Sequence, residues 1–402
     1  MKYKHYFISE LISEISMGPF GSNIKKECFV NFGIPVLNGS NLSGVAMNDD
    51  SFRYVTREKA DSLGKANARR GDIVVTHRGT LGQISFIPKS SVYDRYVISQ
   101  SQFRFRCNEK VLPEYLVYYF HTKKGKYALL SNASQVGVPA LARATTTFQK
   151  LEVDIPSIDN QRKIVDFLEC IRCKIELNKK INKNLEEQAQ AYFNELFITN
   201  RQENWSKGTL ADIGQIVAGG TPSKTHIEYY SSNGIAWITP KDLSINKSKF
   251  ISHGEIDISE LGLAKSSAKK MPAGTVLFSS RAPIGYIAIS TTEVTTNQGF
   301  KSVVPNENIG TPYTYFLLKF LLPTIENMAS GSTFKEISSS GMKSIPIIIP
   351  DNNFLTIFND FCVPIFEQQK NIEFENHRLM IMRNTLLPKL MSGEIDVSNL
   401  DL

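Results

Sequence analysis

Gly71-Asp-Ile-Val-Val-Thr-His-Arg78 and Gly274-Thr-Val-Leu-Phe-Ser-Ser-Arg281 are two versions of one stretch of sequence, 203 positions apart. Each places a short apolar segment behind a glycine and ends at an arginine, which is typical of a buried strand that enters a loop. The period is too long for a solenoid repeat, so the sequence predicts two similar globular modules. Four further pairs keep nearly the same spacing: Gly82-Gln-Ile-Ser-Phe-Ile87 with Gly285-Tyr-Ile-Ala-Ile289, Gly33-Ile-Pro-Val-Leu37 with Gly234-Ile-Ala-Trp-Ile238, Ser99-Gln100 with Asn297-Gln298, and Ile155-Pro156 with Ile349-Pro350.

A helical pattern follows each module. After residue 157 the apolar residues recur every three or four positions, and no proline or glycine interrupts residues 157–200. In the second stripe Pro364 should kink or delay the helix, and Pro388 and Gly393 should end it. This spacing is typical of a coiled-coil seam. The residues expected in the shared core of the two helices are Ile164, Leu168, Ile171, Ile175, Asn178 and Leu185 in the first, and Phe361, Ile365, Ile372, Leu379 and Met382 in the second.

Two long helices in one chain pack most simply as an antiparallel pair. Polar residues in the seam, among them Asn182, Gln368 and Glu375, should fix the register of the pair at some cost in stability. We therefore expect an α+β protein with a pseudo-twofold internal repeat, in which two long antiparallel helices form a coiled-coil spacer between two similar mixed α/β modules.

The modules themselves have the sequence pattern of an α+β fold. We expect strands at residues 71–77, 274–279 and 283–291, and short helices at 113–130 and 312–328. The expected domains are a first module at 1–155, a central spacer helix at 156–204, a second module at 205–348 and a distal spacer helix at 349–402.

Positive charge lies in the modules and not in the helices. The formal charge is +8 over residues 1–155, 0 over 156–204, +3 over 205–348 and −4 over 349–402, which together give the net charge of +7 for the 402 residues. A polyanionic partner would therefore contact the modules, and the helices would suit contacts with proteins. A solvated basic surface without any partner is the alternative interpretation of the same charges.

Composition excludes several classes of protein. The 42% of hydrophobic residues allow each module to bury a core, which excludes general disorder. No apolar run approaches the roughly 18 residues that cross a bilayer, and the N-terminus lacks a signal-peptide pattern, so we expect a cytoplasmic protein without a membrane partner. Cys170 and Cys173 form a CxxC, but it has no second ligand pair, and we expect no metal site.

The sequence lacks the motifs of catalysis. It contains no phosphate-binding GxxxxGK[ST] and no GxGxxG behind a strand. It also lacks Asn-Pro-Pro-Tyr and Asp-Pro-Pro-Tyr, with which amino-methyltransferases hold a flipped base, and any Asp-x-Lys or Glu-x-Lys of metal-dependent nucleases. We expect no catalytic residue and no cofactor in this chain.

Several stretches taken in order resemble the specificity (S) subunit of type I restriction–modification systems. They are Gly18-Pro-Phe-Gly-Ser22, Ile155-Pro-Ser-Ile-Asp-Asn-Gln-Arg-Lys-Ile164, Gly219-Gly-Thr-Pro-Ser-Lys224, Gly234-Ile-Ala-Trp-Ile-Thr-Pro-Lys-Asp-Leu243, Phe278-Ser-Ser-Arg-Ala-Pro-Ile-Gly285, Thr296-Asn-Gln-Gly-Phe300 and Gly331-Ser-Thr-Phe-Lys-Glu-Ile337. The resemblance spans the whole chain. It departs from the family pattern where Asn352-Asn-Phe-Leu355 replaces the glutamine found at Gln161, so the second helix should differ at its start.

The resemblance implies a non-catalytic subunit with two target-recognition domains. Each would read one half of an asymmetric bipartite site in double-stranded DNA, and the helices would set the gap. Two methylation subunits would supply adenine methylation that depends on S-adenosylmethionine. Restriction subunits would supply cleavage and translocation driven by ATP and Mg.

Contacts to DNA need polar or basic side chains on loops. The residues that we nominate are Ser22, Asn23, Lys25, Lys26, Asn41, Arg78 and Arg143 in the first module, and Thr221, Lys224, Lys241, Arg281, Ser332 and Lys335 in the second. A buried ion pair at Arg78 or Arg281 is an equal alternative. The Gly219-Gly-Thr-Pro segment fits a simple tight turn, and Asn297 and Gln298 fit a structural role better than base reading.

Three rival functions remain open from the sequence. The first is a catalytic protein that fuses restriction and methylation, against which the missing motifs count. The second is a duplicated binding protein with a coiled-coil stalk that binds no DNA. The third, within the same family, is a silent specificity cassette.

Overall fold

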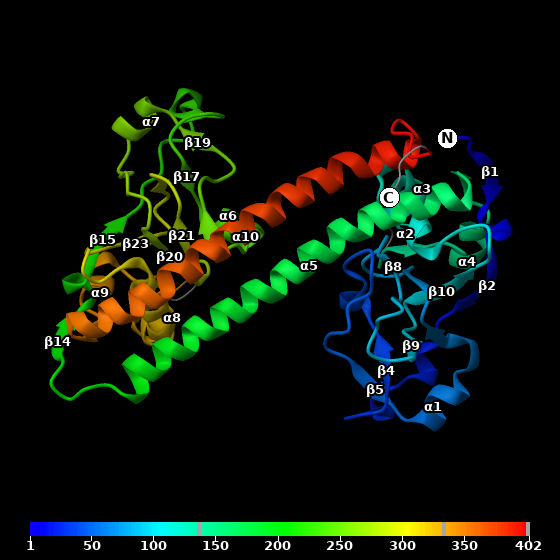
Figure 1. The fold of residues 1–402 in the computed structure, drawn as a ribbon, viewed down its shortest axis with the longest axis horizontal. Coiled ribbons are helices and arrows are strands. Elements are labelled where there is room, and N and C mark those ends of the chain that lie inside the picture. The colour runs from blue at the N-terminus through cyan, green and yellow to red at the C-terminus, as the bar shows by residue number, and fades with distance from the viewer. Residues whose placement is uncertain (135–137, 332–334, 399–402) are drawn as a thin grey trace. The chain divides into compact units, whose positions relative to one another are not determined.

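The computed structural model describes residues 1–134, 138–331 and 335–398. The chain forms two compact units: unit 1 comprises Met1–Lys174 with Leu379–Leu402, and unit 2 comprises Ile175–Arg378. Each unit contains one of the repeated modules and a part of each long helix (Figure 1).

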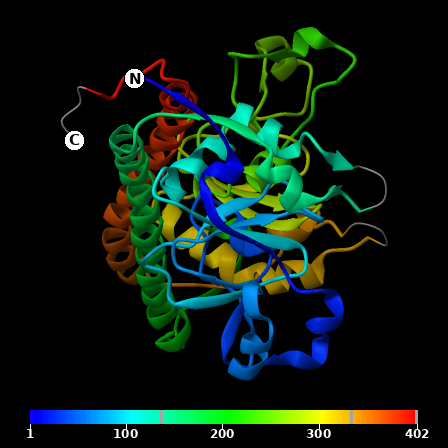
Figure 2. The same ribbon diagram turned by 90° about the vertical axis from the view of Figure 1, so that its right-hand side faces the viewer.

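Unit 1 is built on an antiparallel sheet and a second, mixed sheet. Its strands are β1 (Lys4–Phe7), β2 (Ile12–Met17), β3 (Phe29–Val30), β4 (Ile34–Leu37), β5 (Arg53–Val55), β6 (Asn67–Arg69), β7 (Ile73–Thr76), β8 (Ile84–Phe86), β9 (Arg95–Ile98), β10 (Gln102–Cys107), β11 (Ala133–Ser134), β12 (Ala140–Leu141) and β13 (Glu152–Ile155). Its short helices are α1 (Arg57–Ser62), α2 (Pro113–His121), α3 (Lys123–Leu130) and α4 (Ala144–Gln149). The antiparallel sheet has the order β2-β10-β7-β8, and the second has the order β3-β5-β4-β9-β6. Strands β1 and β2 run along the face that Figure 2 turns toward the viewer.

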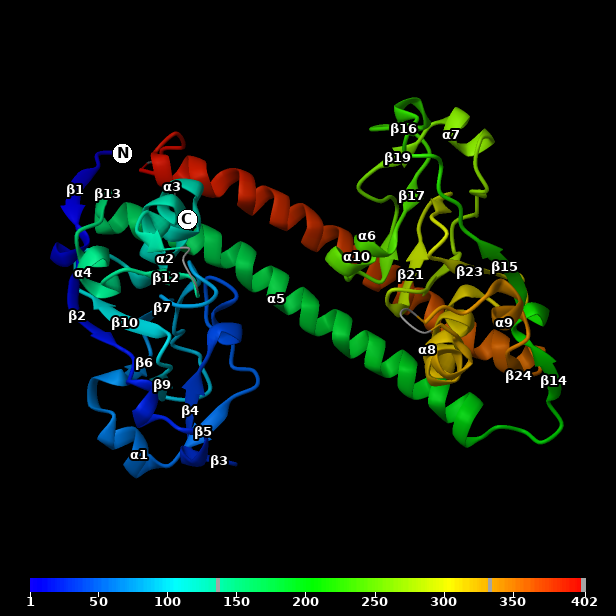
Figure 3. The ribbon, with the colours of Figure 1, turned by 180° about the vertical axis from the view of Figure 1, so that it is seen from behind.

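Unit 2 repeats this plan. Its strands are β14 (Ser206–Thr209), β15 (Gly214–Ala218), β16 (Tyr230–Ser231), β17 (Trp237–Ile238), β18 (Phe250–Ile251), β19 (Asp257–Ile258), β20 (Val276–Ser280), β21 (Ile284–Ser290), β22 (Thr295–Thr296), β23 (Lys301–Pro305) and β24 (Pro346–Ile349). Its short helices are α6 (Pro240–Ile245), α7 (Glu260–Ala264), α8 (Thr311–Met328) and α9 (Ser339–Lys343). Helix α8 packs on the sheet formed in the order β15-β23-β20-β21-β18 (Figure 3).

The strand pairings confirm the internal repeat. The order β2-β10-β7-β8 in unit 1 matches β15-β23-β20-β21 in unit 2. The parallel pair β4 and β9 matches the parallel pair β17 and β22, and the closing pair β1 and β13 matches β14 and β24. The predicted strands at 71–77, 274–279 and 283–291 are β7, β20 and β21, and α8 is the helix predicted at 312–328. The helix predicted at 113–130 is divided into α2 and α3 at Thr122, whose hydroxyl caps α3.

The two long helices are α5 (Ile158–Asn194), which ends in a π-helical turn at Glu195–Thr199, and α10 (Asn352–Ser392). Pro364 does not delay the helix and Pro388 does not end it, because α10 begins before Pro364 and continues through Pro388. An interior proline costs a helix about 3 kcal/mol, and the burial of Phe358 and Phe366 on either side of Pro364 offsets that cost. The helix ends before Gly393, whose φ of 79° suits a left-handed cap.

The buried faces of the long helices follow the modules more than the predicted seam. In α5 the residues Ile164, Leu168, Ile171, Ile175 and Asn178 are buried, and Leu185 is half-buried. In α10 the prediction placed the seam one position away from the buried face, which carries Phe358, Cys362, Phe366 and Gln369. Phe361 and Met382 are about 40% exposed, and Ile365, Ile372 and Leu379 are half-buried. Helix α10 is apolar on two sides, so its sequence alone did not show which side faces the module.

Both long helices complete the hydrophobic core of each unit. In unit 1 the start of α5 contributes Ile164 and Leu168 to the core, and the end of α10 contributes Leu387 and Leu390. The reverse holds in unit 2. There the end of α5 contributes Phe193 and Phe197, and the start of α10 contributes Leu355, Phe358, Cys362 and Phe366.

Polar residues fix the register of the antiparallel helices within unit 2. Asn178 donates to Glu375 Oε2 at 2.7 Å and to Asn376 Oδ1 at 2.9 Å, and Asn182 donates to Glu373 at 3.1 Å. Rising residue numbers in α5 thus meet falling numbers in α10, as an antiparallel pair requires. Of the four polar residues predicted to set the register, Asn178, Asn182 and Glu375 make such bonds, whereas Gln368 is exposed and the buried amide is that of Gln369.

A buried lysine joins the sheet of unit 2 to both long helices. Lys249 is 7% exposed, and its Nζ lies 2.7 Å from Glu186 Oε2 of α5 and 2.8 Å from Gln369 Oε1 of α10. The same ammonium lies 3.4 Å from the ring centroid of Phe366, in the range of a strong cation–π contact. Burial lowers the pKa of Lys249 to about 8, although Glu186 favours the charged form.

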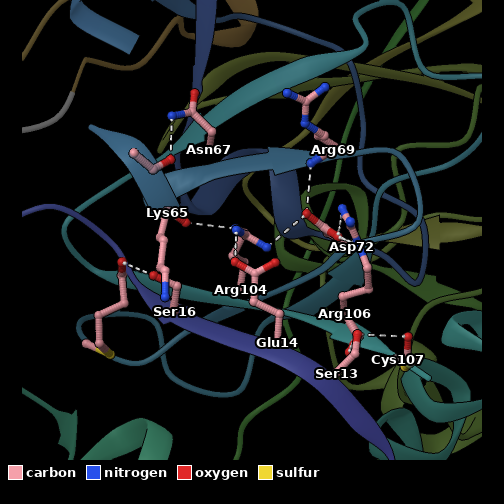
Figure 4. Close-up of polar contacts among 12 residues, drawn as sticks. Ser13, Glu14, Ser16, Lys65, Asn67, Arg69, Asp72, Arg104, Arg106 and Cys107 are labelled. Carbon is pink, nitrogen blue, oxygen red and sulfur yellow. Dashed lines mark hydrogen bonds and ion pairs between the residues drawn. The ribbon is translucent and has the colours of Figure 1, made fainter. Parts of the chain in front are cut away.

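Unit 1 has a different buried ion cluster, shown in Figure 4. The carboxylate of Asp72 is fully buried and lies 2.7 Å from Arg106 Nη2 and 3.3 Å from Arg104 Nη1. Arg104 also contacts Glu14 of β2 at 2.7 Å, so the cluster connects three neighbouring strands of the sheet. The Asp72 carboxylate also accepts the backbone N–H of Arg69 at 2.9 Å, and this bond closes the turn before β7.

We predict that the stability contributed by Lys249 depends on pH. The folded-state pKa of about 8 lies below the unfolded value of 10.5, so the unfolded chain binds more protons between these values and stability rises with pH. Between pH 8 and 10.5 the unfolding free energy of the wild type should increase relative to that of Lys249→Met by up to about 3 kcal/mol, at about 1.4 kcal/mol per pH unit.

Tryptophan fluorescence in urea isolates this effect, because both tryptophans, Trp205 and Trp237, belong to unit 2. Lys247→Met, which removes an exposed lysine from the same loop, is the matched control for net charge. A difference between wild type and Lys249→Met that stays constant over this pH range would contradict the prediction.

Candidate nucleic-acid interface

Three loops and strand β12 meet at one end of the antiparallel sheet in unit 1. His77, directly after β7, donates its N–H to Ser101 O at 2.9 Å and accepts the N–H of Leu141 at its own carbonyl at 2.9 Å. Gly18, directly after β2, donates to Gln102 O at 2.8 Å. Main-chain bonds therefore hold the loops that follow β2, β7 and β9 and the segment of β12 against one another.

Unit 2 repeats this junction almost bond for bond. Ser280, at the end of β20, donates to Gly299 O at 2.7 Å and accepts from Ile337 N at 3.1 Å. Gly219 donates to Phe300 O at 3.3 Å, and Gly220 donates to Thr296 O at 2.8 Å. The candidate interface of each unit is this cluster of loops.

The junction needs glycine after β2 and after β15. A Cβ added at Gly18 would lie 2.0 Å from Ser99 O, and one added at Gly219 would lie 1.9 Å from Asn297 O. Both neighbours are main-chain atoms that cannot move aside. The glycine of each family-like motif is thus explained by a close approach of two loops.

Six of the nominated residues of unit 1 lie near this junction or on its loops, and all six are exposed. Ser22 and Asn23 lie in a 3₁₀ turn (Gly21–Asn23), and Lys25 and Lys26 lie at the start of the next turn. A Cβ at Gly21 would lie 2.2 Å from Gln100 Oε1, which places this segment against the loop before β10. The remaining two are Arg78, which pairs through its backbone with Ala140, and Arg143, which precedes α4 with a φ of 47°.

Asn41 does not fit the predicted contact with DNA. It is fully buried, its Oδ1 accepts the N–H of Asn38 at 3.0 Å, and its Nδ2 donates to Asp50 O at 2.7 Å. Asp242 has the same place in unit 2, where it accepts the N–H of Thr239 at 2.7 Å. Both residues cap a short helix after the strand, and Asn41 has no free group to offer a ligand.

In unit 2 three nominated residues line one cavity of about 560 Å³. Lys224 and Lys241 are exposed, and Thr221 donates its hydroxyl to Gln298 Oε1. Asn297 and Gln298 line the same cavity, although the sequence favoured a structural role for them. Their position opposite Ser99 and Gln100 in the repeat was visible in the sequence, but the cavity wall formed by Tyr230, Trp237 and Ile256 was not.

Arg281 makes an ion pair, as one of the two alternatives for it proposed, but the pair is half-buried and not buried. Its Nη1 lies 3.5 Å from Glu336 Oε2, and the other oxygen of Glu336 lies 3.4 Å from the largely buried Nζ of Lys301. Arg78, at the equivalent position of unit 1, faces Ala140 across its backbone bridge and makes no ion pair with the carboxylates of the described residues. Lys335 is exposed beside Glu336, whereas Ser332 lies outside the described residues.

Metal-binding groups and helices that could span a membrane are both absent from the described residues. Among them, no group of three histidine, cysteine, aspartate or glutamate side chains could hold a metal ion. None of the described helices is long and apolar enough to span a membrane.

A model of the type I restriction modification DNA specificity domain matches residues 17–187 and again residues 202–378. The chain belongs to this family. The two matches coincide with the two copies of the repeat, so the specificity-domain fold occurs twice in one chain.

Relatives with this domain are named specificity subunits. The HindI specificity subunit of Haemophilus influenzae is 25% identical over 465 residues, which cover 95% of this chain and 99% of that protein. The MjaIX specificity subunit of Methanocaldococcus jannaschii is 39% identical over 160 residues, which cover 39% of this chain and only 37% of that protein. The crystal structure of a type I S subunit from M. genitalium shares the fold, with a TM-score of 0.67, 16% identity, and coverage of 97% of this chain and 96% of that one.

We predict that Gly219→Ala disrupts the junction of unit 2. The new methyl group would meet the carbonyl oxygen of Asn297, and overpacking of this kind costs about 1–3 kcal/mol. The Trp237 indole donates to Gly220 O at 3.0 Å, so a shift of tryptophan emission together with a lower unfolding midpoint should report the change.

Gly341→Ala is the matched control in the same unit. Its nearest neighbours are side-chain atoms of Ile337 and Ser338 at 3.2 Å, and Gly341 lies in helix α9, where alanine is favoured. Equal stability of Gly219→Ala and Gly341→Ala would refute the close-approach explanation.

Proposed function

We propose that this chain is the DNA-recognition subunit of a type I restriction–modification complex, and that each module reads one half of an asymmetric bipartite site. The observation that carries the proposal is the repeated loop junction. The same main-chain frame occurs in both units, but it presents different side chains. Arg78 has no ion-pair partner in the part of the chain that the structure describes, whereas the equivalent Arg281 is paired, and Phe20 corresponds to Thr221. The same main-chain frame with different side chains in each unit suits the recognition of two different half-sites.

The charge and exposure of the loops support a polyanionic ligand. In unit 1, Lys25, Lys26, Arg78 and Arg143 are exposed close to the junction, within a module of formal charge +8. Basic side chains on loops are the usual contacts of a protein to DNA phosphates. The exposed amide and hydroxyl of Asn23 and Ser22 lie beside them and suit base edges.

We further propose that the modules at residues 1–155 and 205–348 are the reading heads, and that the helices at 156–204 and 349–402 set the gap between half-sites. The helices also suit docking of methylation subunits. In unit 2 the outer side of α10 exposes Ile357 (53%), Phe361 (41%) and Val363 (50%). In unit 1 it exposes Met380, Ile381 and Met382. Clusters of exposed apolar residues are typical of surfaces that bind other proteins.

In this proposal the chain performs no chemistry. Two methylation subunits would bring S-adenosylmethionine, and restriction subunits would bring ATP and Mg. The complex would act on double-stranded DNA in the cytoplasm. The lack of nucleotide-binding and methyltransferase motifs in the sequence supports this division of roles.

The proposal is tested by co-expression with the methylation subunit of the same system, followed by genome-wide mapping of methylated adenines. We expect one asymmetric motif of two short half-sites with a fixed gap. A second chain, with one heptad inserted into both α5 and α10, should methylate the same half-sites with a longer gap, because about 10 Å of helix is added.

Two results would reject parts of this account. An unchanged gap in the heptad variant would show that the helices do not set the distance between the half-sites. Methyl transfer or cleavage by the purified chain without other subunits would instead support a fused catalytic protein.

A further inference from the structure

The cavity of unit 2 has side-chain amides whose orientation is fixed from within. Asn297 Oδ1 accepts the N–H of Gly299 at 2.9 Å, and Gln298 Oε1 accepts the hydroxyl of Thr221. Among the described residues neither amide NH₂ has a partner. Each amide oxygen therefore already accepts one hydrogen bond within the protein, and each amide still has both N–H groups to offer a ligand in the cavity.

Other polar groups that line the cavity also have hydrogen-bond partners within the protein. The Trp237 indole donates to Gly220 O at 3.0 Å, and the Tyr230 hydroxyl donates to Pro222 O at 2.7 Å. The two oxygens of Asp242 accept N–H groups of Thr239 and Glu255 at 2.7 and 2.9 Å. Each amide or buried carboxylate oxygen of this wall thus already accepts a hydrogen bond from the protein.

The charges around the cavity cancel. Lys241 is paired with Glu255 at 2.6 Å, and the positive charge of Lys224 is balanced by the negative charge of Asp242. A phosphate would gain little from a wall of zero net charge, whereas a neutral group that carries acceptors fits it. The walls of Trp237, Tyr230 and Ile256 suit a flat, partly apolar ligand.

We propose that Asn297 and Gln298 read a base-pair edge that offers acceptors alone, and this inference rests on the proposed function. Two edges of duplex DNA have that chemistry: the major-groove edge of guanine, with N7 and O6, and the minor-groove edge of an A·T pair, with purine N3 and thymine O2. The major-groove edge of adenine is the poorer bidentate partner, since its N6 amino group needs an amide oxygen as acceptor and both amide oxygens already accept a hydrogen bond within the protein.

Gln298→Glu is the informative variant. The carboxylate has the shape of the amide and still accepts the Thr221 hydroxyl, so the inner contact remains. It replaces the outward donor by an acceptor. Gln215→Glu, which adds the same charge at an exposed position of β15 in the same unit, is the matched control.

The experiment selects preferred duplexes from a randomised pool with the full chain in its complex with methylation subunits. We expect Gln298→Glu to bind the wild-type site at least tenfold more weakly and to lose the base preference at one position of one half-site, while Gln215→Glu keeps the wild-type motif. Duplexes with base analogues then identify the edge. Loss of binding with 7-deazaguanine indicates the major groove of guanine, whereas tolerance of inosine·cytosine in place of A·T indicates the minor groove.

Other outcomes overturn the inference in distinguishable ways. If Gln298→Glu weakens all sequences equally and keeps the motif, the cavity contacts the DNA backbone and not a base edge. If the motif and affinity are both unchanged, the cavity lies away from DNA. A wild-type complex that selects no motif at all would reject the proposed function itself.

Discussion

The hydrophobic core of each unit is completed by the start of one long helix and the end of the other. In unit 1 the helix residues Leu168 and Leu390 are buried in the same core as Phe103 and Tyr115 of the module. In unit 2 Phe193 and Phe358 are buried in the same core as Phe278 and Phe316. Neither module encloses its own apolar surface, so module and helices must fold together. This constraint explains why α10 keeps its helix through two prolines.

The loop junction has the same main-chain frame in both units but carries different side chains. The loop junction is built from main-chain hydrogen bonds and from glycines at close approaches, so side chains beyond the junction are free to differ between units. The buried ion pairs of the two units differ as well. Asp72 and Arg104 form an ion cluster in unit 1, where unit 2 has Thr275 and Ser302, which are fully buried and uncharged (Figure 4). Unit 2 instead places a buried ion pair at Lys249, between its sheet and the helices.

Much of the architecture could be predicted from sequence because it depends on local pattern. The strand behind Gly71 and its copy behind Gly274, and the start of α5 after Pro156, follow from hydrophobic periodicity and from the repeat. The strand order could not be predicted, because non-local pairs such as β10 with β2 leave no periodic trace. The buried face of α10 was placed one residue away for a related reason, since its choice of face depends on contacts with a distant module.

The candidate site, too, could be predicted from the sequence only in part. Lys25 and Lys26 were nominated from their type and position, and the structure shows that both are exposed, while their contact with DNA stays a prediction. Asn41 was misjudged because the pattern of a polar loop residue does not distinguish a helix cap from a contact residue. The place of Asn297 and Gln298 in the cavity could not be predicted, because only the folded chain shows which amide atoms are already bonded.

The central claim is that each unit closes its own core and reads its own half of the DNA site. It is tested most directly by a chimaera in which residues 175–378, the whole of unit 2, come from the Haemophilus influenzae relative, because this exchange keeps both cores intact. The measurement is the DNA motif methylated by the chimaeric complex. The account predicts that one half-site stays as in this protein and the other becomes that of the relative. A motif in which both half-sites change, or in which neither does, would contradict it.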